Sequence, residues 1–312
     1  MTAASAARQG ARVPVRVVVV TYSPGESLTT FLDSLSTATS WPVEVVLADN
    51  GSTDEAPERA AAARADVRLL RLASNAGYGA AANAGASGAS GDWLVVVNPD
   101  VEWAPGSLDL LLEAGARWPR AGAVGPAILT PEGDLYPSAR AFPSLGRGIG
   151  HALLGWWWPT NPWTRDYRRE RGVPTEGPTG WLSGSCMLLR REAFEAVGGF
   201  DPAYFMYFED LDLCRRLDAA GWERVHVPAA VVRHTGGHAT SREPLRMQVA
   251  HHRSAYRYLA QEYPGPRWAP LRALLAAGLL GRLLLAVAVR RVRHGATPTR
   301  SGTILAEPKR GS

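Results

Sequence analysis

The chain has 312 residues, of which 46% are hydrophobic and 20% are charged, and these values exclude a disordered, collagen-like or disulfide-scaffold protein. Its two cysteines, Cys186 and Cys214, belong to no Cys/His array, which argues against a structural zinc site and favours a reducing compartment. The formal net charge of +5 is uneven, because residues 265–312 hold nine of the 34 basic side chains and one of the 29 acids. The rest of the chain is therefore slightly acidic.

The N-terminal half alternates strand patterns with helix patterns. Residues 1–14 have only a short apolar run and no cleavage signature, so we expect a flexible start and not a signal peptide. The expected strands are Val15–Tyr22, Val43–Ala48, Val67–Leu72 and Trp93–Val97, and the expected helices are Ser27–Ser36, Glu55–Ala65, Tyr78–Ala89 and one that begins after Pro105. Strands joined by crossover helices predict an α/β fold with a mostly parallel central sheet covered on both faces.

Polar residues follow three of these strands, at the sheet edge where α/β proteins bind ligands. Asp49 opens the run Asp-Asn-Gly-Ser, which is either a tight turn or an acceptor for the ring N–H of uracil or thymine. The segment Asn75–Gly79 lacks the dinucleotide and P-loop fingerprints, but its glycines would let backbone N–H groups approach an anion or allow close helix packing. Asp100 could hold a divalent cation or cap a helix.

The second half is less regular. Residues 131–178 are rich in Pro, Gly, Arg and Trp without periodicity, which predicts a functional loop or lid. Beyond it we expect strands at Trp181–Arg190, Val225–Val227 and Val231–His234 and helices at Arg191–Val197, Glu209–Ala219 and Pro244–Glu262. We therefore divide the chain into residues 1–14 (flexible), 15–130 (regular half), 131–264 (less regular half) and 265–312 (basic tail).

The segment Phe200–Arg216 carries the strongest chemical signal. Glu209 and Asp210 begin a helix, where the dipole favours carboxylates. The aromatic run Tyr204–Phe208 precedes them directly and would bury them, which raises the pKa of a carboxyl group and suits a general base. His234 follows at the end of a short strand, where a lone histidine is more often structural than a ligand.

These motifs together resemble the inverting glycosyltransferases of family 2, which have the A-type nucleotide-sugar fold. The resemblance covers residues 15–263 and rests on the order of DNGS, NAGYG, NPD, WLSGSC, FMYFEDLDLCRR and a later histidine. Further motifs, among them VTYSPG, YPSAR and NPWT, are similar to those of family members that transfer L-rhamnose from dTDP-rhamnose to polyprenyl-diphosphate N-acetylglucosamine in cell-wall linker synthesis. The alternatives are another donor on the same fold, such as a UDP-hexose or UDP-galactofuranose, and a non-catalytic membrane-docked scaffold.

The resemblance implies that residues 15–130 bind the nucleotide sugar and that residues 131–264 bind the acceptor and carry the catalytic residues. It also implies roles for individual residues. Asp210 would deprotonate the acceptor hydroxyl with Glu209 beside it, and Asp100 and His234 would hold Mg²⁺ or Mn²⁺ on the donor diphosphate. The implied nucleotide-sugar-binding residues are Thr21, Tyr22, Asp49, Asn75, Gly77, Asn83 and Asn98, and the implied acceptor-binding residues are Trp181, Ser183, Gly184 and Ser185. Asn98 stands where the family often has a second acid.

The basic tail predicts contact with a membrane. Leu271–Val289 is nineteen residues long, but Arg272 and Arg282 interrupt it, so a transmembrane span is disfavoured. At about 100° per residue, these two arginines, Arg290 and Arg293 fall in an arc of roughly 80°. We expect an amphipathic helix in the membrane interface, with a core helix as the alternative. Trp156–Trp158 could add a contact, no nucleic-acid-binding module is present, and we expect a peripheral protein on the cytoplasmic face of the plasma membrane.

Overall fold

The computed structural model describes the backbone of residues 15–143, 175–236 and 244–295 and forms two compact units, residues 1–258 and 259–312. The strands of the first unit are β1 (Val15–Thr21), β2 (Val43–Asp49), β3 (Val67–Arg71), β4 (Trp93–Val97), β5 (Val101–Trp103), β6 (Ala121–Leu129), β7 (Leu135–Tyr136), β8 (Ala139–Arg140), β9 (Gly177–Pro178), β10 (Trp181–Leu182), β11 (Cys186–Arg190) and β12 (Glu223–His234). The helices that begin in it are α2 (Ser27–Ala38), α3 (Ala56–Ala63), α4 (Tyr78–Ala86), α5 (Ser107–Arg117), α8 (Arg191–Ala196), α9 (Glu209–Ala219) and α11 (Pro244–Glu262).

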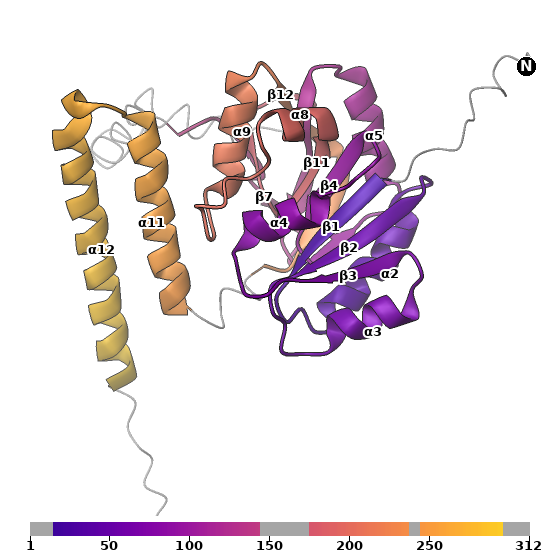
Figure 1. Ribbon diagram of the computed structural model, residues 1–312, viewed down its shortest axis with the longest axis horizontal. Coiled ribbons are helices and arrows are strands. Elements are labelled where there is room, and N and C mark those ends of the chain that lie inside the picture. The colour runs from indigo at the N-terminus through magenta and orange to yellow at the C-terminus, as the bar shows by residue number, and fades with distance from the viewer. Residues whose placement is uncertain (1–14, 144–174, 237–243, 296–312) are drawn as a thin grey trace, which may run out of the picture. The chain divides into compact units, whose positions relative to one another are not determined.

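The strands form one large sheet in the order β3-β2-β1-β4-β11-β6-β12-β5 (Figure 1). Strands β1 to β4 pair in parallel, as do β6 and β12, whereas β11 is antiparallel to both of its neighbours and β5 is antiparallel to β12. The predicted A-type fold, with a mostly parallel sheet flanked by helices, is confirmed.

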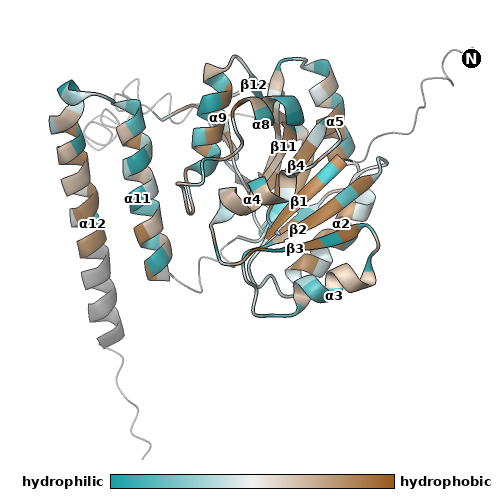
Figure 2. Ribbon diagram, viewed as in Figure 1, coloured by the Kyte–Doolittle hydropathy of each residue, from teal (hydrophilic) through white to brown (hydrophobic). Residues whose placement is uncertain are grey.

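The valine run of β1 shows why both faces are covered. Because side chains alternate along a strand, Val17 and Val19 pack with α2 and α5 on one face, while Val18 and Val20 pack with α4 and α9 on the other. All seven residues of β1 are buried, and the strands at the centre of the sheet are the most hydrophobic part of the ribbon in Figure 2.

Three predicted strands are divided or joined differently in the structure. The strand predicted at Trp181–Arg190 is divided into β10 and β11, because the Gly184 N–H between them bonds a side chain of α9 and not a neighbouring strand. The two short strands predicted near Val225 and Val231 are one long strand, β12, with an irregular register between Val227 and Val231.

Strand β6 was not predicted at all. Its sequence AGAVGPAIL contains two glycines and a proline, which are weak strand formers. Both glycines are required by close packing, since a Cβ at Gly122 would lie 2.8 Å from Trp222 and one at Gly125 would lie 2.7 Å from Leu182. The segment from residue 131 to 178, predicted as a loop, contributes β7, β8 and β9 within its described part, and Trp156–Trp158 lies outside the described residues.

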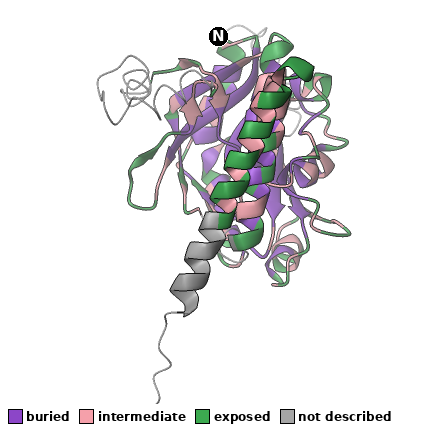
Figure 3. Ribbon diagram, turned by 90° about the vertical axis from the view of Figure 1, so that its left-hand side faces the viewer, coloured by how far each residue is buried: buried purple, intermediate pink, exposed green. Residues whose placement is uncertain are grey.

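The second unit contains the short 3₁₀ helix η1 (Pro266–Trp268) and the long helix α12 (Ala269–Gly295). The tail therefore forms the predicted helix, with wider limits. Among its described side chains none is buried, and Leu274, Leu280 and Leu284 are 70%, 56% and 60% exposed (Figure 3). Arg272, expected on the headgroup stripe, donates to the carbonyls of Tyr263 and Gly265, both at 2.7 Å. Within the described residues, no helix combines the length and apolar character that a bilayer span requires.

Candidate active site

The first part of the site is the β4 cluster, which we define as Asn98, Asp100 and His234. Asn98 and Asp100 follow β4, and His234 ends β12. Strand β5 pairs antiparallel with β12 and places Val101 opposite His234. His234 Nε2 therefore lies 3.1 Å from Asp100 Oδ1 and 3.2 Å from Asn98 Nδ2, and two residues 134 positions apart become neighbours.

The second part is the α9 cluster, defined as Tyr78, Gly184, Glu209 and Asp210. Asp210 Oδ2 accepts a hydrogen bond from Gly184 N at 2.9 Å, and Oδ1 accepts one from Leu211 N at 2.8 Å. The buried hydroxyl of Tyr78 donates to the carbonyl of Gly184 at 2.6 Å. Packing is tight at position 184, because a Cβ there would lie 3.1 Å from the Cβ of Asp210.

The loop Ser183–Ser185 joins the two clusters. Gly184 holds Asp210, and the next carbonyl, that of Ser185, accepts a 2.9 Å hydrogen bond from Asn98 N. The hydroxyls of Ser183 and Ser185 lie 3.2 Å apart. A carboxylate on one side and a carboxylate–imidazole pair on the other are thus held by one short loop.

The backbone before α9 is strained. Tyr207 and Phe208 both have φ of +67°, a region that bulky residues rarely adopt and that marks functional sites. Residues of α11 support this conformation, since the rings of His251 and Tyr258 pack on Phe208, and Ser254 Oγ donates to the Met206 carbonyl at 2.9 Å. The strain therefore fixes how Glu209 and Asp210 enter the site.

Burial makes the two acids of the α9 cluster hard to ionise together. Desolvation and the charge of Asp210 raise the pKa of Glu209 to about 8, from an ordinary value of 4.5. Glu209 is 6% exposed, and its Oε2 has no hydrogen-bond partner among the described residues. Desolvation also raises the pKa of Asp210, while the N–H groups of Gly184 and Leu211 and the charge of Arg140 oppose that rise. Glu209 therefore keeps its proton at neutral pH, and Asp210 is the acid better prepared to carry a charge.

Asp49 is fully buried at the end of β2. Its carboxylate accepts hydrogen bonds from Thr21 Oγ1 at 2.9 Å, from both the N–H and the hydroxyl of Ser52, and from Arg71 Nη1 at 3.4 Å. Thr21 is also fully buried, and Tyr22 is half-buried. Asp49 thus fixes the turn after β2, and its contact with a base stays a prediction.

The Asn75–Gly79 loop is tied to the turn after β2 and to the aromatic run before α9. Asn50 accepts from Ala76 N and donates to the Gly77 carbonyl, at 3.2 Å each. Gly77 has φ of +94°, and a Cβ there would lie 2.3 Å from the Phe205 carbonyl. Asn75 caps its own loop by accepting from Gly77 N at 3.1 Å.

Asn83 lies apart from this loop, within α4. Its amide pairs with both the N–H and the carbonyl of Phe200, at 2.9 and 2.8 Å, so it anchors the segment that leads to α9. Sequence reasoning missed Asn50, Ser52, Arg71 and Tyr78 as partners in the site, although the first two lie within the DNGS motif.

Trp181, expected near the acceptor, stands on a two-stranded ribbon of β8 and β10. It pairs with Arg140, whose guanidinium lies 5.5 Å from the centre of the Trp181 ring, and Ser183 N donates to the Ser138 carbonyl at 2.8 Å. The expected acceptor residues therefore reach from this ribbon to Asp210.

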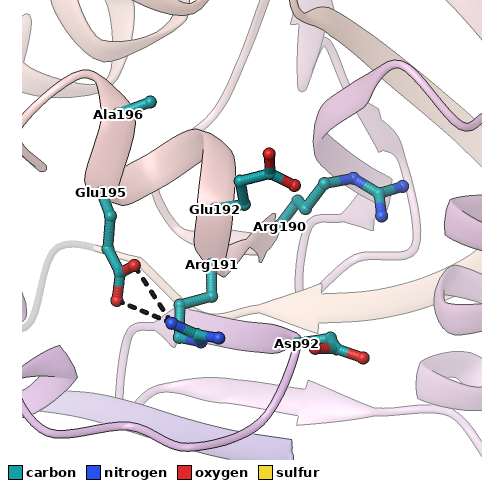
Figure 4. Close-up of a pocket in the computed structure, with 6 residues that line it drawn as sticks. All are labelled: Asp92, Arg190, Arg191, Glu192, Glu195 and Ala196. Carbon is teal, nitrogen blue, oxygen red and sulfur yellow. Dashed lines mark hydrogen bonds and ion pairs between the residues drawn. The ribbon is translucent and has the colours of Figure 1, made fainter.

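A cavity of about 710 Å³ lies elsewhere, lined by Asp92, Arg190, Arg191, Glu192, Glu195 and Ala196 (Figure 4). It lies next to the first residue of β4, because Arg190 pairs with Trp93, whereas Asn98 follows the last one. Three of its charged groups are already engaged, since Arg191 bonds Glu195 and Arg190 bonds the Ala121 and Gly115 carbonyls. The cavity contains none of the predicted site residues.

The chain is similar in sequence to known glycosyltransferases. The model of glycosyl transferase family 2 matches residues 16–198, and that of glycosyl transferase family group 2 matches residues 172–290. The N-acetylglucosaminyl-diphospho-decaprenol L-rhamnosyltransferase of Mycobacterium tuberculosis is 53% identical over 89% of this chain and 95% of its own length.

Solved structures agree on the fold. The mannosyltransferase PcManGT from Pyrobaculum calidifontis, in complex with GDP-Man and Mn²⁺, has a TM-score of 0.56 at 19% identity, with 93% of this chain and 77% of that chain covered. GalNAc-T7 with UDP, GalNAc and Mn²⁺ has a TM-score of 0.54 at 18% identity, with 72% and 43% covered.

The pKa of Glu209 generates a test of the α9 cluster. Because the folded pKa of about 8 exceeds the ordinary 4.5, the folded state binds the proton more tightly, and the unfolding free energy falls as pH rises from about 4.5 to about 8. Glu209→Gln removes this loss, so the variant should gain stability relative to the wild type across that window, by on the order of a few kcal/mol.

The measurement is urea unfolding of both proteins at pH 5.5 and 8.5. Glu192→Gln, which alters an exposed glutamate of α8, is the control and should show no pH-dependent difference. A constant difference between Glu209→Gln and the wild type across this range would mean that Glu209 is already ionised at neutral pH.

Proposed function

This chain belongs to glycosyl transferase family 2, and we propose that it transfers L-rhamnose from dTDP-rhamnose, with inversion, to the N-acetylglucosamine of a polyprenyl-diphosphate lipid in cell-wall linker synthesis. The Mycobacterium tuberculosis relative is named as an L-rhamnosyltransferase that acts on N-acetylglucosaminyl-diphospho-decaprenol, which supports the sugar and the acceptor. The observation that carries the catalytic part is the loop Ser183–Ser185, which binds Asp210 through Gly184 N and Asn98 through the Ser185 carbonyl.

In the proposed reaction, Asp210 accepts the proton of the attacking acceptor hydroxyl. Two backbone N–H groups fix its carboxylate at 2.9 and 2.8 Å, so little reorganisation is needed when the proton moves. The half-buried setting raises the pKa of Asp210 and makes it a better base. Attack and departure of the nucleoside diphosphate from opposite faces of the sugar invert the anomeric carbon in one displacement.

The β4 cluster fits a divalent cation. Asp100 Oδ1 and His234 Nε2 are 3.1 Å apart, and a carboxylate oxygen and an imidazole nitrogen are both metal ligands. Among the described residues no group of three or more His, Cys, Asp and Glu side chains could hold a metal, so the donor diphosphate would complete the site. Mg²⁺ or Mn²⁺ there would neutralise charge on the leaving diphosphate.

The remaining roles follow from position. Thr21, Tyr22 and Asp49 would form the base pocket, Asn75 and Gly77 would approach the nucleotide with Asn83 anchoring α4 behind them, and Trp181 would contact the acceptor sugar. Cys186 and Cys214 are buried and unpaired, which agrees with the proposed cytoplasmic face of the plasma membrane.

The tail would bring the enzyme to its lipid acceptor. Between Arg272 and Arg282, α12 contains only Leu, Ala and Gly, and Leu274, Leu280 and Leu284 are exposed. A helix with exposed leucines and flanking arginines suits the interface of an anionic bilayer.

The function is tested by incubating the protein with dTDP-rhamnose and a lipid-diphosphate N-acetylglucosamine and reading product mass and anomeric configuration. We expect one rhamnose per acceptor with inverted configuration. Asp210→Asn should lower turnover by about 10²- to 10⁴-fold because the base is lost, while donor binding is retained. Asp92→Asn, at the opposite end of β4, is the matched control. Near wild-type turnover by Asp210→Asn would place the base elsewhere.

The donor and metal assignments are tested by thermal unfolding with dTDP, UDP and GDP, each with and without Mn²⁺. A ligand at 100 times its Kd stabilises the folded state by about 2.7 kcal/mol, and we expect dTDP with Mn²⁺ to raise Tm most. Asp100→Asn and His234→Ala should lose only the Mn²⁺-dependent part. A larger response to UDP would favour a UDP-sugar donor, and an unchanged Mn²⁺ effect in both variants would refute the metal site.

Membrane contact is tested by flotation with anionic vesicles. Replacing Leu274, Leu280 and Leu284 together by serine removes apolar surface and should weaken binding by more than about tenfold. Serine at Leu245, an exposed leucine of α11, is the control and should leave binding unchanged. Equal flotation of the triple variant and the wild type would exclude α12 as the anchor.

A further inference from the structure

Arg140 is a cation that lies beside the site. It lies on β8, and its Nε donates to the Pro137 carbonyl at 2.8 Å. Its guanidinium also lies 5.7 Å from the centre of the Tyr136 ring and 5.5 Å from that of Trp181. Two rings and one hydrogen bond therefore orient the side chain, yet among the described residues no hydrogen bond or ion pair engages its terminal N–H groups.

Arg190 shows what a purely structural arginine looks like in this protein. It also lies over an aromatic ring, 4.5 Å from the centre of Trp93, but its guanidinium donates to the carbonyls of Ala121 and Gly115. Arg140 has the same kind of ring support, but among the described residues only its Nε binds a carbonyl, that of Pro137. An oriented guanidinium with free N–H groups is suited to bind phosphate oxygens in a bidentate manner.

The β8–β10 ribbon fixes where this cation lies in relation to the chemistry. Arg140 pairs with Trp181, and the chain runs from Trp181 through Leu182 and Ser183 to Gly184, whose N–H binds Asp210. Desolvation raises the pKa of Asp210, and the positive charge of Arg140 opposes that rise. Arg140 therefore belongs to the side of the site that holds the base.

The surroundings also suit an amphiphile. Leu135 and Tyr136 of β7 are 47% and 40% exposed, which makes them two of the most exposed large hydrophobic residues described outside α11 and α12. The Tyr136 ring is the one that contacts Arg140. Apolar surface next to a cation whose terminal N–H groups have no partner among the described residues matches a molecule that joins an anionic group to a hydrocarbon chain.

We propose that Arg140 binds the diphosphate of the lipid acceptor, with Trp181 against the acceptor sugar and Leu135 and Tyr136 beside the first part of the lipid. This inference rests on the proposed function. The diphosphate is attached to the same N-acetylglucosamine whose hydroxyl gives its proton to Asp210, so it lies within one sugar ring of that carboxylate. The donor diphosphate belongs instead at the β4 cluster.

The experiment compares two soluble acceptors: a short-chain alkyl diphosphate N-acetylglucosamine and the neutral alkyl glycoside of the same sugar. KM and kcat are measured for the wild type, Arg140→Gln, Arg140→Lys and the control Arg68→Gln, which removes an exposed arginine of β3. Binding of both acceptors without donor is measured by calorimetry, and dTDP binding is measured alongside.

We expect the wild type and Arg68→Gln to prefer the diphosphate acceptor. Arg140→Gln should raise its KM and Kd by about 10- to 100-fold, as for loss of a charged hydrogen bond, with little change for the neutral glycoside or dTDP. Arg140→Lys should recover part of the preference for the diphosphate acceptor, because lysine keeps the positive charge but lacks the planar bidentate geometry of the guanidinium.

Three results would overturn the proposal. In the first, Arg140→Gln weakens the binding of both acceptors equally, or only shifts the pH profile of turnover. Arg140 would then act on Asp210 alone. In the second, dTDP binding weakens, and the cation then serves the donor. In the third, the folded wild type does not distinguish the two acceptors. If the wild type transfers no rhamnose, the proposed function fails, and calorimetry still decides whether Arg140 binds the diphosphate.

Discussion

The site depends on one three-residue loop, Ser183–Ser185, between β10 and β11. Its backbone accepts from Tyr78 and Asn98 and donates to Asp210, so three segments that are far apart in sequence are held at fixed separations. A backbone loop can do this because its N–H and carbonyl groups are obligatory hydrogen-bonding groups that must find partners when buried. The position of Asp210 and the position of the β4 cluster are therefore not independent, and a disturbance of Gly184 would move both.

Burying two adjacent acids is costly, and the structure shows how the cost is limited. Glu209 keeps its proton at neutral pH, because desolvation and its neighbour raise its pKa to about 8. Asp210 receives two backbone N–H groups and the field of Arg140, which favour its ionised form. Desolvation still raises the pKa of Asp210, but these groups oppose that rise, and the hydrogen bonds hold its oxygens in place. The strained Tyr207 and Phe208 that set this arrangement are supported by α11.

The sequence predicted those parts that local pattern encodes. Trp93–Val97, Glu209–Ala219 and Pro244–Glu262 have the predicted limits, because a buried strand needs a continuous apolar run and a helix needs an apolar face with a clear start. Asp49 and Asp100 were placed at strand ends for the same reason, since polar residues that stop an apolar run mark the edge of a sheet. The motif order was enough to indicate the family, whose model matches residues 16–198.

Only the tertiary structure decided which of these polar ends meet. Strand β5, three residues long, carries no usable pattern, yet its pairing with β12 brings Asp100 to His234. Strand β6 could not be predicted from its sequence, because its glycines make room for Trp222 and Leu182, which are remote in sequence. Nothing in the sequence distinguished Arg140 from other arginines, because its contact with Trp181 is formed by the pairing of β8 with β10. The chain alone determined the elements and the chemical groups, whereas strand pairing, a long-range interaction, determined their distances, and catalysis depends on distances.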